Sequence, residues 1–129
     1  MTGNLDIIKA HYAASDRGDL DGMLAAVAAD ARWIEMAGAP TAGDYVGPDA
    51  VRAGVFHAIG RDWSSYAFRL ERLIDAGDDV IGIGRYEGAY RATGKTFACR
   101  VAHVWRLAGG RIIRFEQFAD TAEMARAMS

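Results

Sequence analysis

The sequence has little of several features that would place it in a specialised class. Cys99 is its only cysteine, so no disulfide can form within the chain and a reducing compartment is expected. The longest apolar run, Met23–Ala29, is far too short to span a bilayer. The N-terminal segment MTGNLDIIKA lacks the basic region and apolar core of a signal peptide. We therefore expect a soluble, cytoplasmic protein with no membrane partner.

The sequence also has no long run of residues with the same charge. The 15 basic and 17 acidic residues are spread along the chain and leave a net charge of -2, which argues against a nucleic-acid partner. There is no glycine-rich phosphate loop, and the three histidines do not have a metal-ligand spacing. We expect no cofactor and no metal. The 129 residues suffice for one domain, spanning residues 1–129, with a core and a modest cavity.

The helical signals lie mainly in the first half of the chain. A helix is expected over residues 4–17, with Gly18 as its stop, and a second over residues 19–29, with Asp19 as its N-cap. Pro48 opens a third helix that ends near Gly60. Asp120 begins a short C-terminal helix with a start resembling a capping box.

The other segments alternate as strands do. Strands are expected over residues 31–36, 64–74, 80–92, 97–107 and 112–120, with residues 37–47 as a loop. Helices segregated from a mostly antiparallel sheet give an α+β fold. A bent sheet with helices across its mouth would enclose a cavity.

His103 interrupts an apolar strand face. Phe97, Cys99, Val101, Trp105 and Leu107 share its side of the strand. His103 is therefore either a core histidine with a hydrogen-bond partner or part of a pocket wall.

Hairpin turns predict the neighbours of this face. A two-residue turn at Thr93–Gly94 pairs His103 with Gly84, as well as Trp105 with Gly82, Val101 with Tyr86, Cys99 with Gly88 and Arg100 with Glu87. Glycines opposite large residues would hold a cavity open for a flat ligand.

The next hairpin has two possible registers. A loop with one extra residue around Gly110 pairs Trp105 with Phe115 and His103 with Gln117, together with Leu107 and Ile113. A tight Gly109–Gly110 turn would place Glu116 opposite His103 and exchange the faces. The aromatic match favours the first register.

Two segments carry a resemblance to a known family. GDLDGMLAAVAADARWIEMAG, residues 18–38, resembles the helix-turn-helix-strand opening of the ketosteroid isomerases, and HVWRLAGGRIIRFEQFAD, residues 103–120, resembles the final hairpin of SnoaL-like polyketide cyclases. Both groups belong to the nuclear transport factor 2-like superfamily. The resemblance covers nearly the whole chain in element order. It implies a cone-shaped barrel of a strongly bent sheet, with N-terminal helices closing a pocket.

The resemblance also implies site residues. The isomerases use a carboxylate base and an oxyanion hole made by a tyrosine and a protonated Asp. The base position falls on Glu35, the protonated-Asp position on His103, and the tyrosine position on His11, with Tyr12 next to it. The histidine of the cyclases also coincides with His103, whereas their acid/base aspartate falls on Gln117, which cannot exchange a proton near neutral pH.

From these observations we expect an apolar-pocket protein, and possible isomerase, cyclase or lyase chemistry without a cofactor. Glu35 would abstract a proton from a small apolar carbonyl compound, and His103 would donate a hydrogen bond to the enolate oxygen. In a shared apolar pocket each would stabilise the charged form of the other. The predicted substrate-binding residues are His11, Tyr12, Trp33, Tyr86, Val101, Trp105, Phe115 and Gln117.

The alternative is a non-catalytic ligand-binding or dimeric accessory protein of the same fold. Glu35 would then be an exposed ion-pair partner and His103 a core histidine. In either case we expect a homodimer, because the sheet face opposite the pocket is unusually apolar. Its apolar residues are Ile83, Ala98, Ala102, Val104 and Phe118.

Overall fold

The computed structural model describes residues 3–129. Helices and strands follow in the order α1 (Asn4–Asp16), α2 (Leu20–Leu24), β1 (Val27–Glu35), β2 (Gly43–Val46), α3 (Pro48–Val51), the π-helical turn η1 (Arg52–Phe56), α4 (His57–Asp62), β3 (Trp63–Ala76), β4 (Asp79–Tyr90), β5 (Thr96–Ala108), β6 (Arg111–Ala119) and α5 (Thr121–Met128). The expected α+β class and the meander of the last four strands are confirmed.

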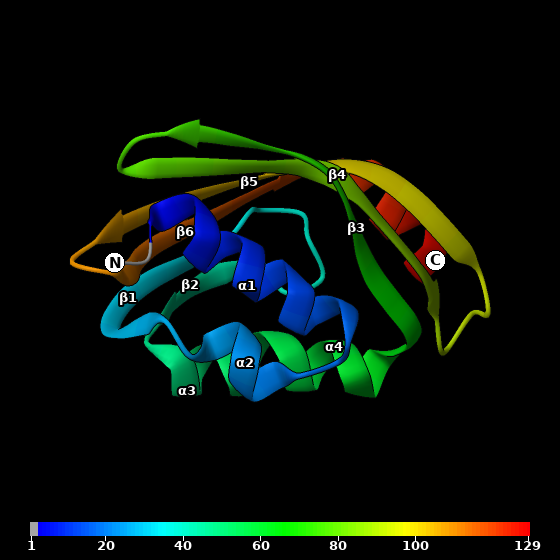
Figure 1. Ribbon diagram of the computed structural model, residues 1–129. Coiled ribbons are helices and arrows are strands. Elements are labelled where there is room, and N and C mark those ends of the chain that lie inside the picture. Colours follow the sequence, from blue (N-terminus) through cyan, green and yellow to red (C-terminus); the bar gives the residue numbers. More distant parts are fainter. Residues whose placement is uncertain (1–2) are drawn as a thin grey trace.

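The strands form one curled sheet in the order β2-β1-β6-β5-β4-β3. All neighbours are antiparallel except β1 and β6, which run parallel. The sheet curves over α1, and α2, α3 and α4 lie across its open side (Figure 1). The space between the helices and the inner face of the sheet therefore holds the main core and the site.

The second helix is shorter than expected, and β1 begins earlier. Residues 27–29 belong to β1 rather than to an alanine-rich helix, and residues 43–46, expected as loop, form β2. The Ile112 N–H donates to the Ala26 carbonyl at 2.8 Å, and Val27 pairs with Ile112 and is buried. Parallel pairing with a distant strand outweighs the local helix propensity of alanine here.

The predicted N-cap near the start of the chain is confirmed, whereas the one predicted near its C-terminus is not. The Asp19 carboxylate accepts from the Gly22 N–H at 2.9 Å, as expected of an N-cap, and Gly18 has φ 70° after α1. The Asp120 side chain makes no capping hydrogen bond, so that expectation is wrong. Burial of Met124 and Ala127 against the sheet holds α5 instead.

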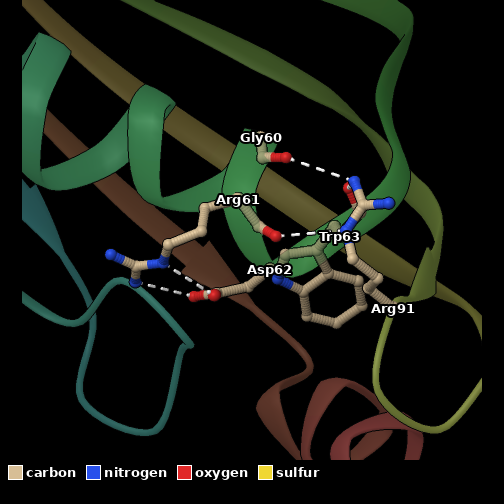
Figure 2. Close-up of polar contacts among 5 residues, drawn as sticks. All are labelled: Gly60, Arg61, Asp62, Trp63 and Arg91. Carbon is tan, nitrogen blue, oxygen red and sulfur yellow. Dashed lines mark hydrogen bonds and ion pairs between the residues drawn. The ribbon is translucent and has the colours of Figure 1, made fainter.

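The helical segment across the open side of the sheet ends at Asp62, close to the expected end near Gly60, and Arg91 binds its C-terminal end. The Arg91 guanidinium donates to the carbonyls of Arg61 at 3.1 Å, Trp63 at 3.1 Å and Gly60 at 3.3 Å (Figure 2). These are carbonyls that a helix end leaves without partners. Arg91 lies in the β4–β5 loop, so this contact ties the loop to the helices that wall the cavity.

The register predicted for the β4–β5 hairpin is wrong by two residues. The Tyr90 N–H donates to the Lys95 carbonyl, so the loop spans residues 91–94 rather than Thr93–Gly94 alone. The predicted partners of His103, Trp105, Val101, Cys99 and Arg100 change accordingly. The observed pairs are His103 with Gly82, Trp105 with Val80, Val101 with Gly84, Cys99 with Tyr86, Phe97 with Gly88 and Arg100 with Arg85. An even shift preserves the faces, so His103 still points inward.

The β5–β6 hairpin combines both registers considered from the sequence. The turn at Gly109–Gly110 is tight, with φ 58° and 76°, and pairs Leu107 with Ile112 rather than Ile113. A register shift between Arg106 and Leu107 then restores the expected pairs of Trp105 with Phe115 and of His103 with Gln117.

The glycines of β4 do not hold the cavity open, contrary to expectation. A Cβ on Gly82 would lie 2.3 Å from the Tyr12 hydroxyl oxygen. On Gly84 it would lie 2.2 Å from the Arg69 carbonyl oxygen, and on Gly88 2.5 Å from the Ser65 carbonyl oxygen. These glycines permit close approach of α1 and of the irregular strand β3. Gly84→Val should therefore disturb the fold, not only ligand binding.

We expect Gly82→Ala to destabilise the protein by about 1–3 kcal/mol, since an added methyl group displaces the Tyr12 hydroxyl from a packed core. Gly60→Ala is the matched control, because its Cβ would meet open space on α4. There the change should stabilise by about 0.5–1 kcal/mol. Urea unfolding of both variants measures the two effects, and equal stability of the two would contradict this account of Gly82.

Candidate functional site

A cavity of about 230 Å³ lies between α1, the helices over residues 52–62 and the inner face of the sheet. Its lining residues are His11, Tyr12, Ser15, Asp16, Met23, Trp33, Glu35, Val55, Phe56, Ile59, Tyr66, Ala67, Phe68, Arg69, Tyr86, His103 and Phe115. Asp16 and Arg69 are exposed and mark its mouth, whereas Glu35 and His103 are buried.

The structure brings most of the predicted site residues to this cavity. His11, Tyr12, Trp33, Glu35, Tyr86, His103 and Phe115 line it. Val101, Trp105 and Gln117 do not. Trp105 is fully buried in the main core, Val101 packs in a second apolar cluster near α5, and Gln117 lies behind Tyr86. Their substrate-binding role is therefore withdrawn, while the roles of the lining residues remain predictions.

Sequence reasoning missed one wall of the cavity. Tyr66 and Phe68 on β3, and Val55, Phe56 and Ile59 on the helices, also line it. The alternating pattern predicts that Tyr66 and Phe68 lie on the same face of their strand. The residues around them do not indicate that β3 curves back over the cavity. The π-helical turn at residues 52–56 was not readable from residue pattern.

Glu35 ends β1 with only 5 % of its surface exposed. The Thr41 hydroxyl donates to its Oε1 at 2.8 Å, and the Gln117 Nε2 donates to the same oxygen at 3.4 Å. Glu35 makes no ion pair within residues 3–129, so the reading of Glu35 as an exposed ion-pair partner is wrong. Oε2 forms no hydrogen bond of standard geometry in that range, the Trp33 indole lies close enough to act on the carboxyl group, and Glu35 lines the cavity.

Burial sets the charge state of this carboxyl group. It raises the pKa of Glu35 to about 7, against the smaller lowering effects of the Thr41 hydroxyl and the Trp33 indole. The Trp33 N–H is buried and forms no hydrogen bond of standard geometry within the described chain. Glu35 is thus a carboxyl group that exchanges a proton near neutral pH, which is the range in which a general base works best.

Two tyrosine hydroxyls hold the His103 ring. The Tyr12 hydroxyl lies 2.8 Å from Nδ1, and the Tyr86 hydroxyl lies 2.8 Å from Nε2. The Phe68 ring stacks on the imidazole at 4.4 Å, and the Phe115 ring meets it edge-on at 4.9 Å. Both ring nitrogens therefore have a protein hydroxyl as partner, and Gln117 contacts Tyr86 rather than His103 itself.

His103 is neutral because of its burial, which lowers its pKa to about 3, with a further lowering by the charge of His11. Glu35 does not contribute to that shift, contrary to the mutual stabilisation expected from the sequence. Tyr86 and Gln117 separate the two groups in the hydrogen-bond pattern.

His11 has one defined tautomer. Its Nδ1 lies 3.0 Å from the Met23 carbonyl oxygen, which can only accept, so Nδ1 carries the proton. Burial lowers the pKa of His11 to about 4, which leaves Nε2 as an unprotonated acceptor on the cavity wall. Tyr12, one residue further along α1, supplies the hydroxyl group that the resemblance placed near this position.

The polar groups form one continuous row across the inner face of the sheet. Its members, in order, are Trp105, Tyr12, His103, Tyr86, Gln117, Glu35 and Thr41. The Met36 N–H donates to the Gln117 Oε1 at 3.3 Å and so fixes the orientation of that amide. The row gives these buried polar groups protein partners and includes the hydroxyl and carboxyl groups of the largely apolar cavity wall.

Tyr66 is a further hydroxyl group of the cavity. Burial and the charge of Glu35 raise its pKa well above the ordinary value. Its hydroxyl has no hydrogen-bond partner within residues 3–129. The neutral phenol is therefore available to a ligand.

Within the described chain, no three His, Cys, Asp or Glu side chains cluster as a metal site would require. Nor does any helix among residues 3–129 combine the length and apolar character needed to cross a bilayer.

Comparison with known proteins places this geometry in a family. The family model of the SnoaL-like domain matches residues 8–115. An NTF2-like protein of Burkholderia thailandensis E264 has a TM-score of 0.99 at 52% identity, over 100% of this chain and 99% of that one. An NTF2-like protein of unknown function from Burkholderia pseudomallei K96243 has a TM-score of 0.91 at 30% identity, over 100% and 99%.

A third structure, TerC co-crystallised with polyporic acid, has a TM-score of 0.85 at 23% identity, over 98% of both chains, and shows a shared fold. No curated protein matches the chain at a significant level. The expected fold and resemblance are confirmed: the chain belongs to the SnoaL-like family of NTF2-like proteins.

Proposed function

We propose that the protein binds a small, largely apolar carbonyl compound and transfers a proton on it, as an isomerase or cyclase would. One observation carries the proposal. Glu35 is a buried carboxyl group that lines the cavity, and its pKa is raised to about 7. A buried group of this kind is costly for stability, and such groups concentrate at functional sites.

The chemistry uses Glu35 as the base. Oε2 takes a proton from the carbon next to the ligand carbonyl, the C–H electron pair forms the enolate C=C bond, and the carbonyl π electrons move onto oxygen. The protonated carboxyl group can then return the proton to another carbon of the conjugated system. A base in this position typically contributes about 10²–10⁴-fold to the rate.

The enolate oxygen receives its hydrogen bond from a phenol rather than from His103. Tyr12 and Tyr86 line the cavity and are bonded to the two nitrogens of His103, which positions them. Burial raises the pKa of both phenols, so each keeps its proton at neutral pH, and a phenol that does not donate to His103 can donate to the enolate oxygen. His103 is a positioning residue in this proposal.

The size of the cavity narrows the ligand class. A dry engineered cavity of about 150 Å³ holds benzene, which has six non-hydrogen atoms. By that scale, about 230 Å³ accommodates roughly nine non-hydrogen atoms. This favours a substituted single ring over a whole steroid. TerC, which shares the fold, was co-crystallised with polyporic acid, and this supports small-ligand binding in the family fold.

The second candidate function is ligand binding without catalysis. The hydrogen-bonded row satisfies itself within the protein, which a purely binding or accessory protein would also need. The burial of Glu35 at the cavity wall favours catalysis, because binding an apolar ligand gains nothing from a buried carboxyl group without an ion-pair partner.

We expect Glu35→Gln to reduce proton exchange by at least 100-fold. The assay follows deuterium uptake from D₂O by NMR, at carbons next to the carbonyl, in a panel of single-ring ketones and enones. The wild-type rate should rise as pH increases through about 7, since only the ionised carboxylate accepts a proton.

Glu116→Gln is the control, because Glu116 lies on the neighbouring strand β6 and pairs with Arg114 on the outer face. It should leave the exchange rate unchanged. Binding of panel members with no exchange in the wild type, at any pH, would favour the non-catalytic candidate.

We also propose a homodimer that pairs through the outer face of the sheet. Phe118 there is 43 % exposed, and Ile83 and Val104 are partly exposed among ion pairs such as Arg106–Asp79. We expect sedimentation equilibrium at micromolar concentration to give twice the monomer mass of 13.9 kDa. A Phe118→Lys variant should shift the protein toward monomer, and a monomeric wild type would contradict the proposal.

A further inference from the structure

The environment of His103 limits how many hydroxyl protons Tyr12 and Tyr86 can offer to a ligand in the cavity. The Trp105 indole N–H donates to the Tyr12 oxygen at 2.9 Å, and the Gln117 Nε2 donates to the Tyr86 oxygen at 2.9 Å. Both of these partners can only donate. Each phenol proton therefore has two possible acceptors, a nitrogen of His103 or a ligand in the cavity.

A neutral imidazole has one N–H group and one lone pair, so two arrangements exist. In the first, Nδ1–H donates to the Tyr12 oxygen, Tyr86 donates to Nε2, and the Tyr12 proton is free. In the second, Tyr12 donates to Nδ1, Nε2–H donates to the Tyr86 oxygen, and the Tyr86 proton is free. In both arrangements one phenol donates to the cavity and the other can only accept from it.

We propose that His103 couples Tyr12 and Tyr86 into one donor and one acceptor, so that the cavity selects a ligand with a carbonyl group conjugated through C=C to an O–H or N–H group. Vinylogous acids and vinylogous amides are such ligands. The inference deepens the proposed function and rests on it for the cavity as a ligand site, but not for the role of Glu35.

The coupling also provides a path for moving the ligand's proton. Starting from the first arrangement, the Tyr12 proton passes to the ligand carbonyl oxygen, and Nδ1–H replaces it on Tyr12. The Tyr86 proton passes to Nε2, and the ligand O–H proton replaces it on Tyr86. A vinylogous acid thereby exchanges its carbonyl and hydroxyl ends, the protein reaches the second arrangement, and no net charge forms.

Packing favours this coupling over ring rotation. Phe68 stacks on the imidazole at 4.4 Å, Phe115 meets its edge at 4.9 Å, and the ring is buried. Gly82 lies beneath the Tyr12 hydroxyl, where a Cβ would come within 2.3 Å of the oxygen. The ring and hydroxyl positions are thus fixed by packing, and the protons are the part of the network left to rearrange.

Three neutral ring compounds test the coupling. 3-Methyl-2-cyclohexenone has one acceptor, 2,2-dimethyl-1,3-cyclopentanedione has two acceptors, and 3-amino-2-cyclohexenone has one acceptor and one donor. The Tyr66 phenol, which also lines the cavity, would be a further donor, so Tyr66→Phe is present in every protein of this comparison, and "wild type" here means unchanged at position 103. Calorimetric titration at pH 8 compares the dissociation constants of the three compounds. In the wild type we expect the amino compound to bind at least about tenfold more tightly than the methyl compound, and the dione to bind no more tightly than the methyl compound.

His103→Phe is the matched variant, because it keeps an aromatic ring beside Phe68 but removes both ring nitrogens. Both phenol protons then become free, so the dione should gain about tenfold in affinity and the amino compound should lose its advantage. Glu35 is the same in both proteins, and its contribution cancels in the comparison. A wild type that binds the dione most tightly, or binds none of the three compounds, would overturn the proposal.

A measurement on the wild type keeps the test independent of whether the variant folds. Nitrogen-15 NMR of labelled histidine at pH 7 should give one protonated and one unprotonated ring nitrogen for His103. Two protonated nitrogens would overturn the proposal. Failure of the base role of Glu35 is distinguishable, since the Glu35→Gln exchange assay would then fail while the order of ligand affinities persists.

Discussion

The structure depends on a physical constraint: polar groups buried inside the curled sheet need hydrogen-bond partners, and here they are one another's partners. The row from Trp105 through Tyr12, His103 and Tyr86 meets that constraint at one end. Gln117 and Thr41 meet it around Glu35 at the other end. An unsatisfied buried polar group costs about 1–3 kcal/mol, so the row fixes the rotamers of its members and, with them, the shape of the cavity.

Burial has opposite effects on the pKa values of His103 and Glu35, two members of the row. It lowers the pKa of His103 to about 3, so the imidazole stays neutral and serves as a fixed partner of two phenols. It raises the pKa of Glu35 to about 7, so the carboxyl group changes charge near neutral pH. Glu35 and His103 are both buried, and their roles differ because burial favours the neutral form of each: a protonated acid for Glu35 and an unprotonated imidazole for His103.

Much of this arrangement could be predicted from the sequence. Two-residue alternation identified the inward face of β5, and Glu35 and His103 were placed at the cavity by resemblance. The predicted pairing of His103 with Gly84 is wrong because the loop after Tyr90 is longer than the Thr93–Gly94 turn that the sequence indicates. Since sheet faces repeat every two residues, that error changed the partners of His103 but not its direction.

What the sequence could not provide were contacts between distant elements. Tyr12 reaches His103 and Trp105 because Gly82 leaves room for its hydroxyl, and these residues lie far apart in the chain. Tyr66 and Phe68 face the cavity because β3 curves at its irregular pairing with β4. Local propensity also predicted a helix through residue 29, whereas residues 25 and 26 form a turn and β1 begins at Val27, which pairs with Ile112 of β6.

The central claim is that the Glu35 carboxyl group is held, by burial beside an open cavity, at a pKa suited to proton transfer at neutral pH. Carbon-13 NMR of the labelled Glu35 side chain, assigned by its absence in Glu35→Gln, measures this directly across the pH range in which the protein stays folded. The account predicts a titration midpoint of about 7. A midpoint at the ordinary value of 4.5 would mean that the carboxyl group is solvated, and would contradict the account.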